Sequence, residues 1–257
     1  MKIGSCYSVD DALYRYPREA DYVELSAMEI YGLCEEKFEQ LCEAVRLGKI
    51  KTYSCNGLVP GNIRLCGEDF DPETVRSYCE FTFSRLAALG ITMLVFGSSK
   101  AKHIPDGFSR EVAYRQLIEA GRILADCAKM RGQRVVIEPL SYNEVNVINT
   151  VEDAAMYVHD IDRENAGLLV DYYHFINNGE DVCSLYDTRE LICHTHFAVP
   201  LVRTFIKSAE DEKHIHDFVK MLRDIGYEGA ISYEGNPNTP SPEFSRSLSF
   251  MRRAANN

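Results

Sequence analysis

The sequence lacks the cysteine pairs that mark a disulfide framework or a zinc ribbon. Its nine cysteines are odd in number and none form a Cys-x-x-Cys pair, so we expect reduced thiols. The residues after Met1 lack the long apolar segment of a signal peptide. No apolar run approaches the roughly 20 residues that cross a bilayer. These absences predict a cytoplasmic protein with no membrane partner.

Positive charge is also scarce. The chain has 28 basic and 39 acidic residues and a net charge of −11, a balance that repels a phosphate backbone unless a basic stripe compensates. The nearest basic cluster, Lys100, Lys102 and His103, has no interleaved aromatic residues to stack on bases. We interpret this cluster as a solvated loop and expect no nucleic-acid partner.

The chain does contain short apolar, β-rich runs that alternate with longer segments of helical period, as in repeated βα units. Helix start signals stand at Asp71, Ser109 and Thr150, and residues 71–90 and 109–130 carry amphipathic patterns. We predict eight strands, over residues 2–5, 21–25, 51–55, 92–97, 134–139, 167–171, 191–197 and 230–234.

Two architectures compete for such an alternation, a (β/α)8 barrel and an open doubly wound sheet. The open sheet usually carries a glycine-rich phosphate turn after its first strand, and this sequence has neither that turn nor a Walker-type Gly-Lys-Ser. No linker divides the chain and no repeat period suggests a solenoid. We therefore predict one α/β domain over residues 1–257, a (β/α)8 TIM barrel.

Four of the late predicted strands end on acidic or imidazole side chains, where the active sites of such barrels lie. A single acid at a strand end could pair with a local Arg or Lys or face solvent. Several such endings together favour a divalent cation, because an unpaired carboxylate beside a buried apolar run is very costly. The four residues are Glu138, Asp171, His196 and Glu234.

The ligand types indicate the metal. Three carboxylates and one imidazole without a thiolate suit Mn2+, Mg2+, Co2+ or Zn2+. His194 and His196 share one face of their strand by its two-residue period, and His196 lies nearer the mouth. We assign His196 to the metal and His194 to a supporting or packing role.

In these motifs the chain resembles the xylose isomerase-like barrel superfamily, in particular its sugar phosphate isomerase/epimerase branch with the ketose 3-epimerases. The similarity covers essentially the whole chain and is strongest from Arg134 onward. Its most specific parts are Glu138-Pro139-Leu140 with Glu144, Asp171-x-x-His174, His194-x-His196, Gly226-Tyr227-x-Gly229 before Tyr233-Glu234, and Phe96-Gly97-Ser98.

The resemblance implies that the four strand-end residues bind the metal and that Glu138 and Glu234 form the acid/base pair. A cation chelated by a ketone and the neighbouring hydroxyl acidifies the carbon between them and stabilises the enediolate. Return of the proton to the opposite face gives epimerisation, and return to the adjacent carbon gives aldose–ketose isomerisation.

Further roles follow from the resemblance at other positions. Glu144 and His174 match residues that hydrogen-bond substrate hydroxyls. Arg203 lies near the family's substrate-binding arginine, one residue further from His196. The family's Asn-Arg pair is replaced by Ser141-Tyr142, which implies a substrate different from those of the best-known members.

Three residues nearer the N-terminus have weaker signals. Glu24, which ends the second predicted strand, has two open roles, as a substrate contact or as a structural carboxylate. Asn56 and Ser98 follow the third and fourth predicted strands, where we expect turn roles rather than contacts with a sugar.

Two other enzyme classes share this type of barrel. A lyase of the keto-inositol dehydratase type passes through a similar enolate but expels a hydroxyl, and the sequence does not separate it from an epimerase. An endonuclease IV-like hydrolase needs histidines where Asn56 and Ser98 stand, and the acidic balance disfavours DNA. The resemblance also implies a homo-oligomer, a dimer or a tetramer, acting on a small sugar.

Overall fold

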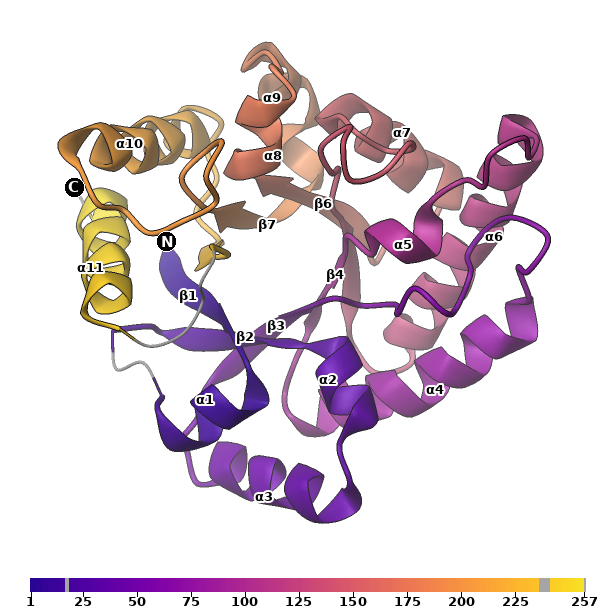
Figure 1. Cartoon of the computed structure of the whole chain (residues 1–257), viewed down its shortest axis with the longest axis horizontal. Helices are drawn as coiled ribbons and strands as arrows, with labels where there is room; N and C mark the ends of the chain where they lie inside the picture. Colours follow the sequence, from indigo (N-terminus) through magenta and orange to yellow (C-terminus); the bar gives the residue numbers. More distant parts are fainter. Residues whose placement is uncertain (17–18, 236–240, 257) are drawn as a thin grey trace.

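Eight parallel strands close into a barrel in chain order, and β1 pairs with β8 to complete it. The computed structural model describes residues 1–16, 19–235 and 241–256. Figure 1 shows the strands at the centre with helices around them, which confirms the predicted TIM barrel. The strands are β1 (Lys2–Tyr7), β2 (Tyr22–Ser26), β3 (Thr52–Asn56), β4 (Met93–Phe96), β5 (Arg134–Ile137), β6 (Ala166–Asp171), β7 (Ile192–Phe197) and β8 (Ala230–Tyr233).

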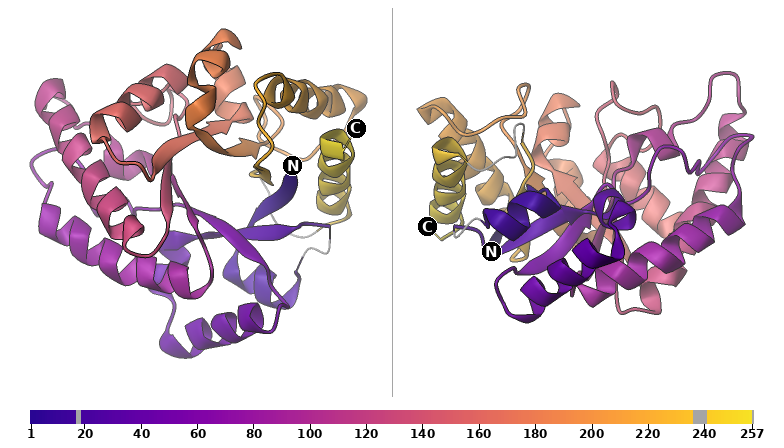
Figure 2. Two further views of the ribbon diagram at one scale, coloured as in Figure 1. Left: turned by 180° about the vertical axis from the view of Figure 1, so that it is seen from behind. Right: turned by 60° about the horizontal axis from the view of Figure 1, so that its bottom comes forward.

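The helices form the outer ring, and α11 lies beside β1 (Figures 1 and 2). Asp71 and Thr150 cap their helices as predicted, and Ser109 accepts from Val112 N–H. No helix of the described residues is long and apolar enough to cross a bilayer. The helical elements are α1 (Val9–Tyr14), α2 (Ala27–Gly32), α3 (Glu35–Arg46), α4 (Pro72–Ala88), α5 (Ser99–Lys102), α6 (Arg110–Lys129), α7 (Val151–Ile161), α8 (Tyr172–Asn177), α9 (Cys183–Thr188), the 3-10 turn η1 (Arg189–Leu191), α10 (Ala209–Asp224) and α11 (Pro242–Asn256).

The predicted strands agree with the observed ones to within one or two residues at each end. β5 and β8 end earlier than predicted, just before Glu138 and Glu234. The Glu138 N–H nevertheless donates to the Phe96 carbonyl at 3.2 Å, and the Glu234 N–H donates to the Phe197 carbonyl at 2.9 Å. Both glutamates are therefore held by the neighbouring strand at the carboxyl edge of the barrel.

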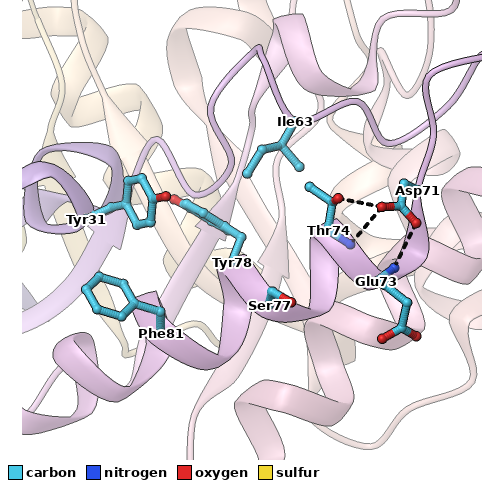
Figure 3. A pocket seen from close by; sticks show the side chains of 8 residues that line it. All are labelled: Tyr31, Ile63, Asp71, Glu73, Thr74, Ser77, Tyr78 and Phe81. Carbon is cyan, nitrogen blue, oxygen red and sulfur yellow. Dashed lines mark hydrogen bonds between the residues drawn. The ribbon is translucent and has the colours of Figure 1, made fainter.

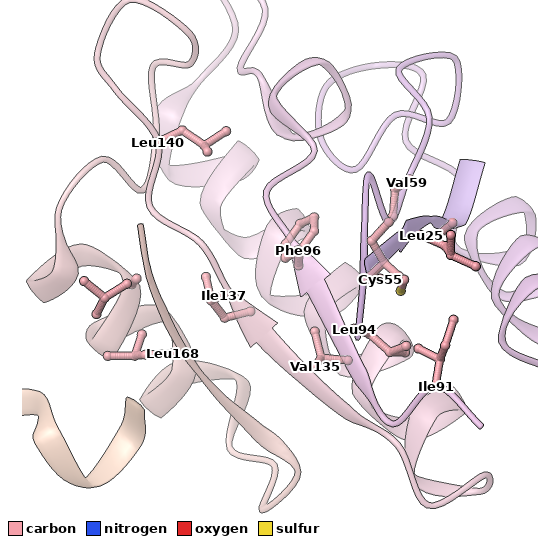
Figure 4. Packing of buried hydrophobic residues seen from close by; sticks show 14 of the residues in the cluster. Leu25, Cys55, Val59, Ile91, Leu94, Phe96, Val135, Ile137, Leu140 and Leu168 are labelled. Carbon is pink, nitrogen blue, oxygen red and sulfur yellow. The ribbon is translucent and has the colours of Figure 1, made fainter. Parts of the chain in front are cut away.

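Alternate residues of the strands pack on opposite faces of the barrel wall. The outward-facing set joins one large core with the helices, and Figure 4 shows Leu94, Phe96, Val135 and Ile137 of this set. The inward-facing set forms a separate apolar cluster of Met93, Val95, Val136 and Leu169. A second part of the interior holds a buried polar network around Glu24, made of Tyr22, Ser54, His194 and Ser232.

The predicted solvated loop around Lys102 is wrong for that residue. Residues 99–102 form the short helix α5, which turns the Lys102 side chain inward and leaves it with no exposed surface. Its ammonium group donates to the Glu138 main-chain carbonyl at 3.0 Å, and burial lowers the pKa of Lys102 to about 8. Lys100, two residues earlier, is exposed as expected.

Gly4 of β1 is a position where the barrel interior has no room for a side chain. An added Cβ would lie 2.1 Å from the buried ring of Tyr22, which a 2.8 Å hydrogen bond between its hydroxyl and Ser232 Oγ holds in place. We expect Gly4→Ala to lower the free energy of unfolding by about 1–3 kcal/mol through overpacking, measured by urea denaturation.

The matched control is Gly32→Ala, at the end of α2, where an added Cβ meets no atom within 4 Å. Its unfolding free energy should stay within about 0.5 kcal/mol of the wild type. Equal stabilities of the two variants would contradict the tight approach of β1 to Tyr22.

Candidate metal centre

Four side chains meet at the carboxyl edge of the barrel, two from β6 and β7 and two from the residues that directly follow β5 and β8. They are Glu138, Asp171, His196 and Glu234, and one possible ligand atom from each lies within 4.8 Å of those of the other three. Asp171 stands opposite His196 in the register of β6 and β7. The structure thus brings together the whole predicted ligand set.

The unpaired atoms of this cluster fit a divalent cation. Glu138 Oε1 and Asp171 Oδ2 are buried and have no hydrogen-bond partner among the described residues, although burying an unpaired carboxylate oxygen is costly. His196 Nδ1 faces both glutamates, 3.4 Å from Glu138 Oε1 and 3.2 Å from Glu234 Oε2. Carboxylate oxygens and an imidazole nitrogen suit a hard or borderline cation.

The other nitrogen of His196 is engaged by a carboxylate of β2. His196 Nε2 lies 2.9 Å from Glu24 Oε1, and neither side chain has exposed surface. Burial lowers the pKa of His196, but the charges of Glu24 and Glu234 outweigh it and raise the pKa well above its usual range. Because Nε2 is bonded to Glu24, Nδ1 is the nitrogen that would bind a cation, and it would lose its proton on binding. A carboxylate behind a ligating histidine fixes the tautomer and the ring orientation in metal sites.

Glu24 has further partners that bear on its two predicted roles. Its Oε2 accepts hydrogen bonds from Ser54 Oγ at 2.5 Å, Ser232 Oγ at 2.8 Å and His194 Nε2 at 2.9 Å. A fully buried carboxylate with both oxygens occupied fits the structural role and not a contact with substrate. The contacts of His194 likewise fit the supporting role predicted for it.

Negative charge dominates this cluster. Burial raises the pKa of Glu138 and of Asp171, and the charge of Glu234 adds to the effect. Burial acts on Glu234 too, but the charges of Arg203 and His196 outweigh it and bring the pKa of Glu234 to about 2. A bound cation would relieve the repulsion among the three carboxylates.

Arg203 reaches the cluster from the segment after β7, despite its one-residue offset from the family pattern. Its Nη2 lies 2.7 Å from Glu234 Oε2 and its Nη1 lies 3.6 Å from Glu144 Oε1. The guanidinium also stacks on the Tyr173 ring, 5.0 Å from its centroid. The left-handed backbone of Arg203, with a φ of 47°, is part of what turns the side chain back over the mouth.

His174 and Glu144, for which substrate-binding roles were predicted, lie beside the four candidate ligands. His174 Nδ1 accepts the Ser141 N–H at 3.1 Å, so the proton of the neutral ring is on Nε2. That Nε2 lies 3.6 Å from Asp171 Oδ2 and has no hydrogen-bond partner in the described part of the chain. Ser141, at a departure from the family pattern, therefore orients His174.

Asn56 has a contact that the sequence did not indicate. Its Nδ2 donates to Glu234 Oε1 at 3.3 Å, although a turn role was expected. Ser98 does have a local role, because its Oγ accepts the Val59 N–H at 2.9 Å. The sequence signal that could have indicated this contact is the polar residue at the carboxyl end of β3.

A cavity of about 410 Å³ opens above the cluster at the barrel mouth. Its acidic side chains and Arg203 come from the segments that follow β5, β7 and β8, whereas the opposite side carries Lys100 and mainly small or apolar residues. The lining residues are Met28, Asn56, Gly57, Val59, Gly61, Gly97, Ser98, Ser99, Lys100, Glu138, Leu140, Glu144, Arg203 and Glu234.

A larger groove of about 660 Å³ lies on the outside of the barrel, between α2 and the start of α4. Figure 3 shows Tyr31, Tyr78 and Phe81 at one end of it and the Asp71 carboxylate bonded to the first turn of α4 at the other. No group of metal-ligating side chains among residues 1–16, 19–235 and 241–256 includes a residue of this groove. The smaller cavity at the mouth, by contrast, is lined by Glu138 and Glu234 of the cluster.

Comparison with known proteins agrees with this architecture. Residues 18–254 match the model of the xylose isomerase-like TIM barrel family, and the chain belongs to that family. The solved structure of a 3-keto-D-glucoside 4-epimerase from E. coli superposes with a TM-score of 0.78 at 19% identity, over 98% of this chain and 99% of that one. The IOLI protein, solved with a bound zinc atom, gives a TM-score of 0.71 at 17% identity, over 99% and 96%.

Two curated relatives are sugar epimerases. A 3-dehydro-D-guloside 4-epimerase from Escherichia coli is 30% identical over 135 residues, 51% of this chain and 50% of that protein. A ketose 3-epimerase from Arthrobacter globiformis is 31% identical over 134 residues, 51% of this chain and 45% of that protein. The chain thus spans about half the length of the curated relatives it matches.

Removal of Glu24 tests whether it holds His196 in place. We expect Glu24→Ala to weaken Mn2+ binding by about 10–100-fold, as is usual when the partner of a ligating histidine is lost, measured by calorimetry. Glu180→Ala is the control, because Glu180 accepts the Val151 N–H at 2.7 Å at the start of α7, outside the cluster. Equal Mn2+ affinities of these two variants would show that Glu24 does not support the site.

Proposed function

We propose that this protein is a divalent-metal-dependent epimerase or isomerase of a ketose or a related keto-polyol. The observation that carries the proposal is the convergence of three carboxylates and one imidazole at the barrel mouth, with two carboxylate oxygens left unpaired. The sugar epimerases among the relatives support the same class of reaction.

The residues that would hold the cation are Glu138, Asp171, His196 through Nδ1, and Glu234. When bound, a divalent cation supplies Lewis acidity, which makes a carbon beside a ketone easier to deprotonate. The IOLI protein, which has the same fold, was solved with a bound zinc atom, and this supports the proposal of a metal.

Glu138 and Glu234 are the proposed acid/base pair. One carboxylate removes the proton from the carbon next to the ketone, and the other returns a proton to the opposite face or to the adjacent carbon. They directly follow β5 and β8, and each has a carboxylate oxygen within 3.4 Å of His196 Nδ1. Asn56 and Arg203 hold Glu234 through its two oxygens.

Substrate hydroxyls would be oriented by His174, Glu144 and Arg203. The unpartnered Nε2–H of His174 is a donor to a substrate oxygen, while Glu144 accepts from a hydroxyl. The Arg203 guanidinium, between Glu144 and Glu234, closes this side of the cavity. Oriented binding of this kind lowers the entropy cost of the proton transfer.

Exchange with solvent deuterium tests the reaction directly. The metal-loaded protein is incubated in deuterated water with a panel of ketoses and keto-polyols, and deuterium at carbon is read by mass and NMR. We expect uptake at the carbon beside the carbonyl without loss of water, and no uptake after chelation of the metal. Loss of water from the product would point to a dehydratase, and no uptake across the panel would remove support for the proposal.

The acid/base pair is tested by neutral substitutions of the same shape. We expect Glu138→Gln and Glu234→Gln each to lower the exchange rate by about 10²–10⁴-fold, the usual contribution of a general acid or base. Thermal unfolding should still show a folded barrel, and Glu180→Gln should keep wild-type exchange. Wild-type rates in either mouth variant would exclude that residue as acid or base.

A further inference from the structure

A fully buried lysine stands next to the proposed catalytic glutamate and has no part in the reaction so far described. Lys102 has no exposed surface, and its Nζ donates to the Glu138 carbonyl at 3.0 Å and lies 5.6 Å from the Phe96 ring centroid. Taking an ammonium group out of water costs several kcal/mol, and the hydrogen bond to the Glu138 carbonyl recovers only part of that cost. Fold stability therefore does not explain Lys102.

The same segment that carries Lys102 holds Glu138 at three points. The Glu138 N–H donates to the Phe96 carbonyl at 3.2 Å, and the Glu138 carbonyl accepts from Lys102. The carboxylate passes over Gly97 so closely that a Cβ there would lie 2.2 Å from Glu138 Oε2. Main chain and carboxylate of Glu138 are thus both placed by residues 96–102.

The backbone of Lys102 is itself fixed. Ser98 has a left-handed φ of 41°, and its carbonyl accepts the N–H groups of Ala101 at 3.1 Å and Lys102 at 3.2 Å. The Leu65 N–H donates to the Ala101 carbonyl at 2.9 Å. The ammonium group is therefore presented to Glu138 from a rigid turn that two segments of the chain support.

We propose that Lys102 is a positioning residue, which fixes the main chain at Glu138 and so aims the Glu138 carboxylate at the cation and the substrate. The inference rests on the proposed function, in which Glu138 is both a metal ligand and one member of the acid/base pair. Lys102 acts only through Glu138, since it is not among the residues that line the cavity.

Lys102→Met tests this because a charge effect and a positioning effect predict opposite changes in the affinity for Co2+. Removal of a positive charge beside the cluster would by electrostatics alone tighten the binding of a divalent cation. If Lys102 positions Glu138, Co2+ instead binds about 10–100-fold more weakly, and the visible spectrum of the bound Co2+ changes. The metal-free variant should still unfold cooperatively, which shows that the barrel is folded, while deuterium exchange slows.

Lys129→Met is the charge control, because Lys129 is an exposed residue away from the mouth, where its Nζ lies 2.8 Å from Glu164 Oε1. The Co2+ affinity of this variant should equal that of the wild type. Equal or tighter Co2+ binding by Lys102→Met with an unchanged spectrum overturns the inference, and so does a wild type that binds no Co2+. A wild type that binds Co2+ but exchanges no deuterium would refute the proposed function alone, and weakened Co2+ binding in Lys102→Met would then still support the positioning role.

Discussion

The structure depends on the burial of several carboxylates in one small volume at the barrel mouth. Carboxylate oxygens of Glu138, Asp171 and Glu234 lie within 4.8 Å of one another. Burying these negative charges together is strongly unfavourable unless positive charge and hydrogen-bond donors compensate them. The guanidinium of Arg203 compensates part of the negative charge of Glu234 through their ion pair. The oxygens of Glu138 and Asp171 that remain unpaired are the ones a cation would occupy.

Residues from separate segments of the chain contact the members of this cluster and orient them. Glu24 of β2 holds His196 from one side, Ser141 of the β5 loop orients His174, and Lys102 after β4 binds the main chain of Glu138. The closed barrel makes this possible, because it brings the carboxyl ends of all eight strands to one rim. Each support therefore comes from a different part of the sequence than the residue it holds.

The fold and the four candidate ligands could be predicted from the sequence because two kinds of signal coincide. Each late strand is a short apolar run that ends on a ligand type, so periodicity and residue chemistry coincide at Glu138, Asp171, His196 and Glu234. The supports carry no such signal. The burial of Lys102 depends on the left-handed turn at Ser98, and the choice between two roles for Glu24 depends on the register that sets β7 and β8 around it, neither of which periodicity reveals.

The central claim is that the four side chains bind one cation together, and anomalous scattering from a crystal grown with Mn2+ tests it most directly. The account predicts one strong peak at the mouth, about 2.0–2.3 Å from a carboxylate oxygen of each acid and from the imidazole, with His196 ligating through Nδ1. A peak elsewhere, or no peak at the mouth at saturating Mn2+, would contradict the account.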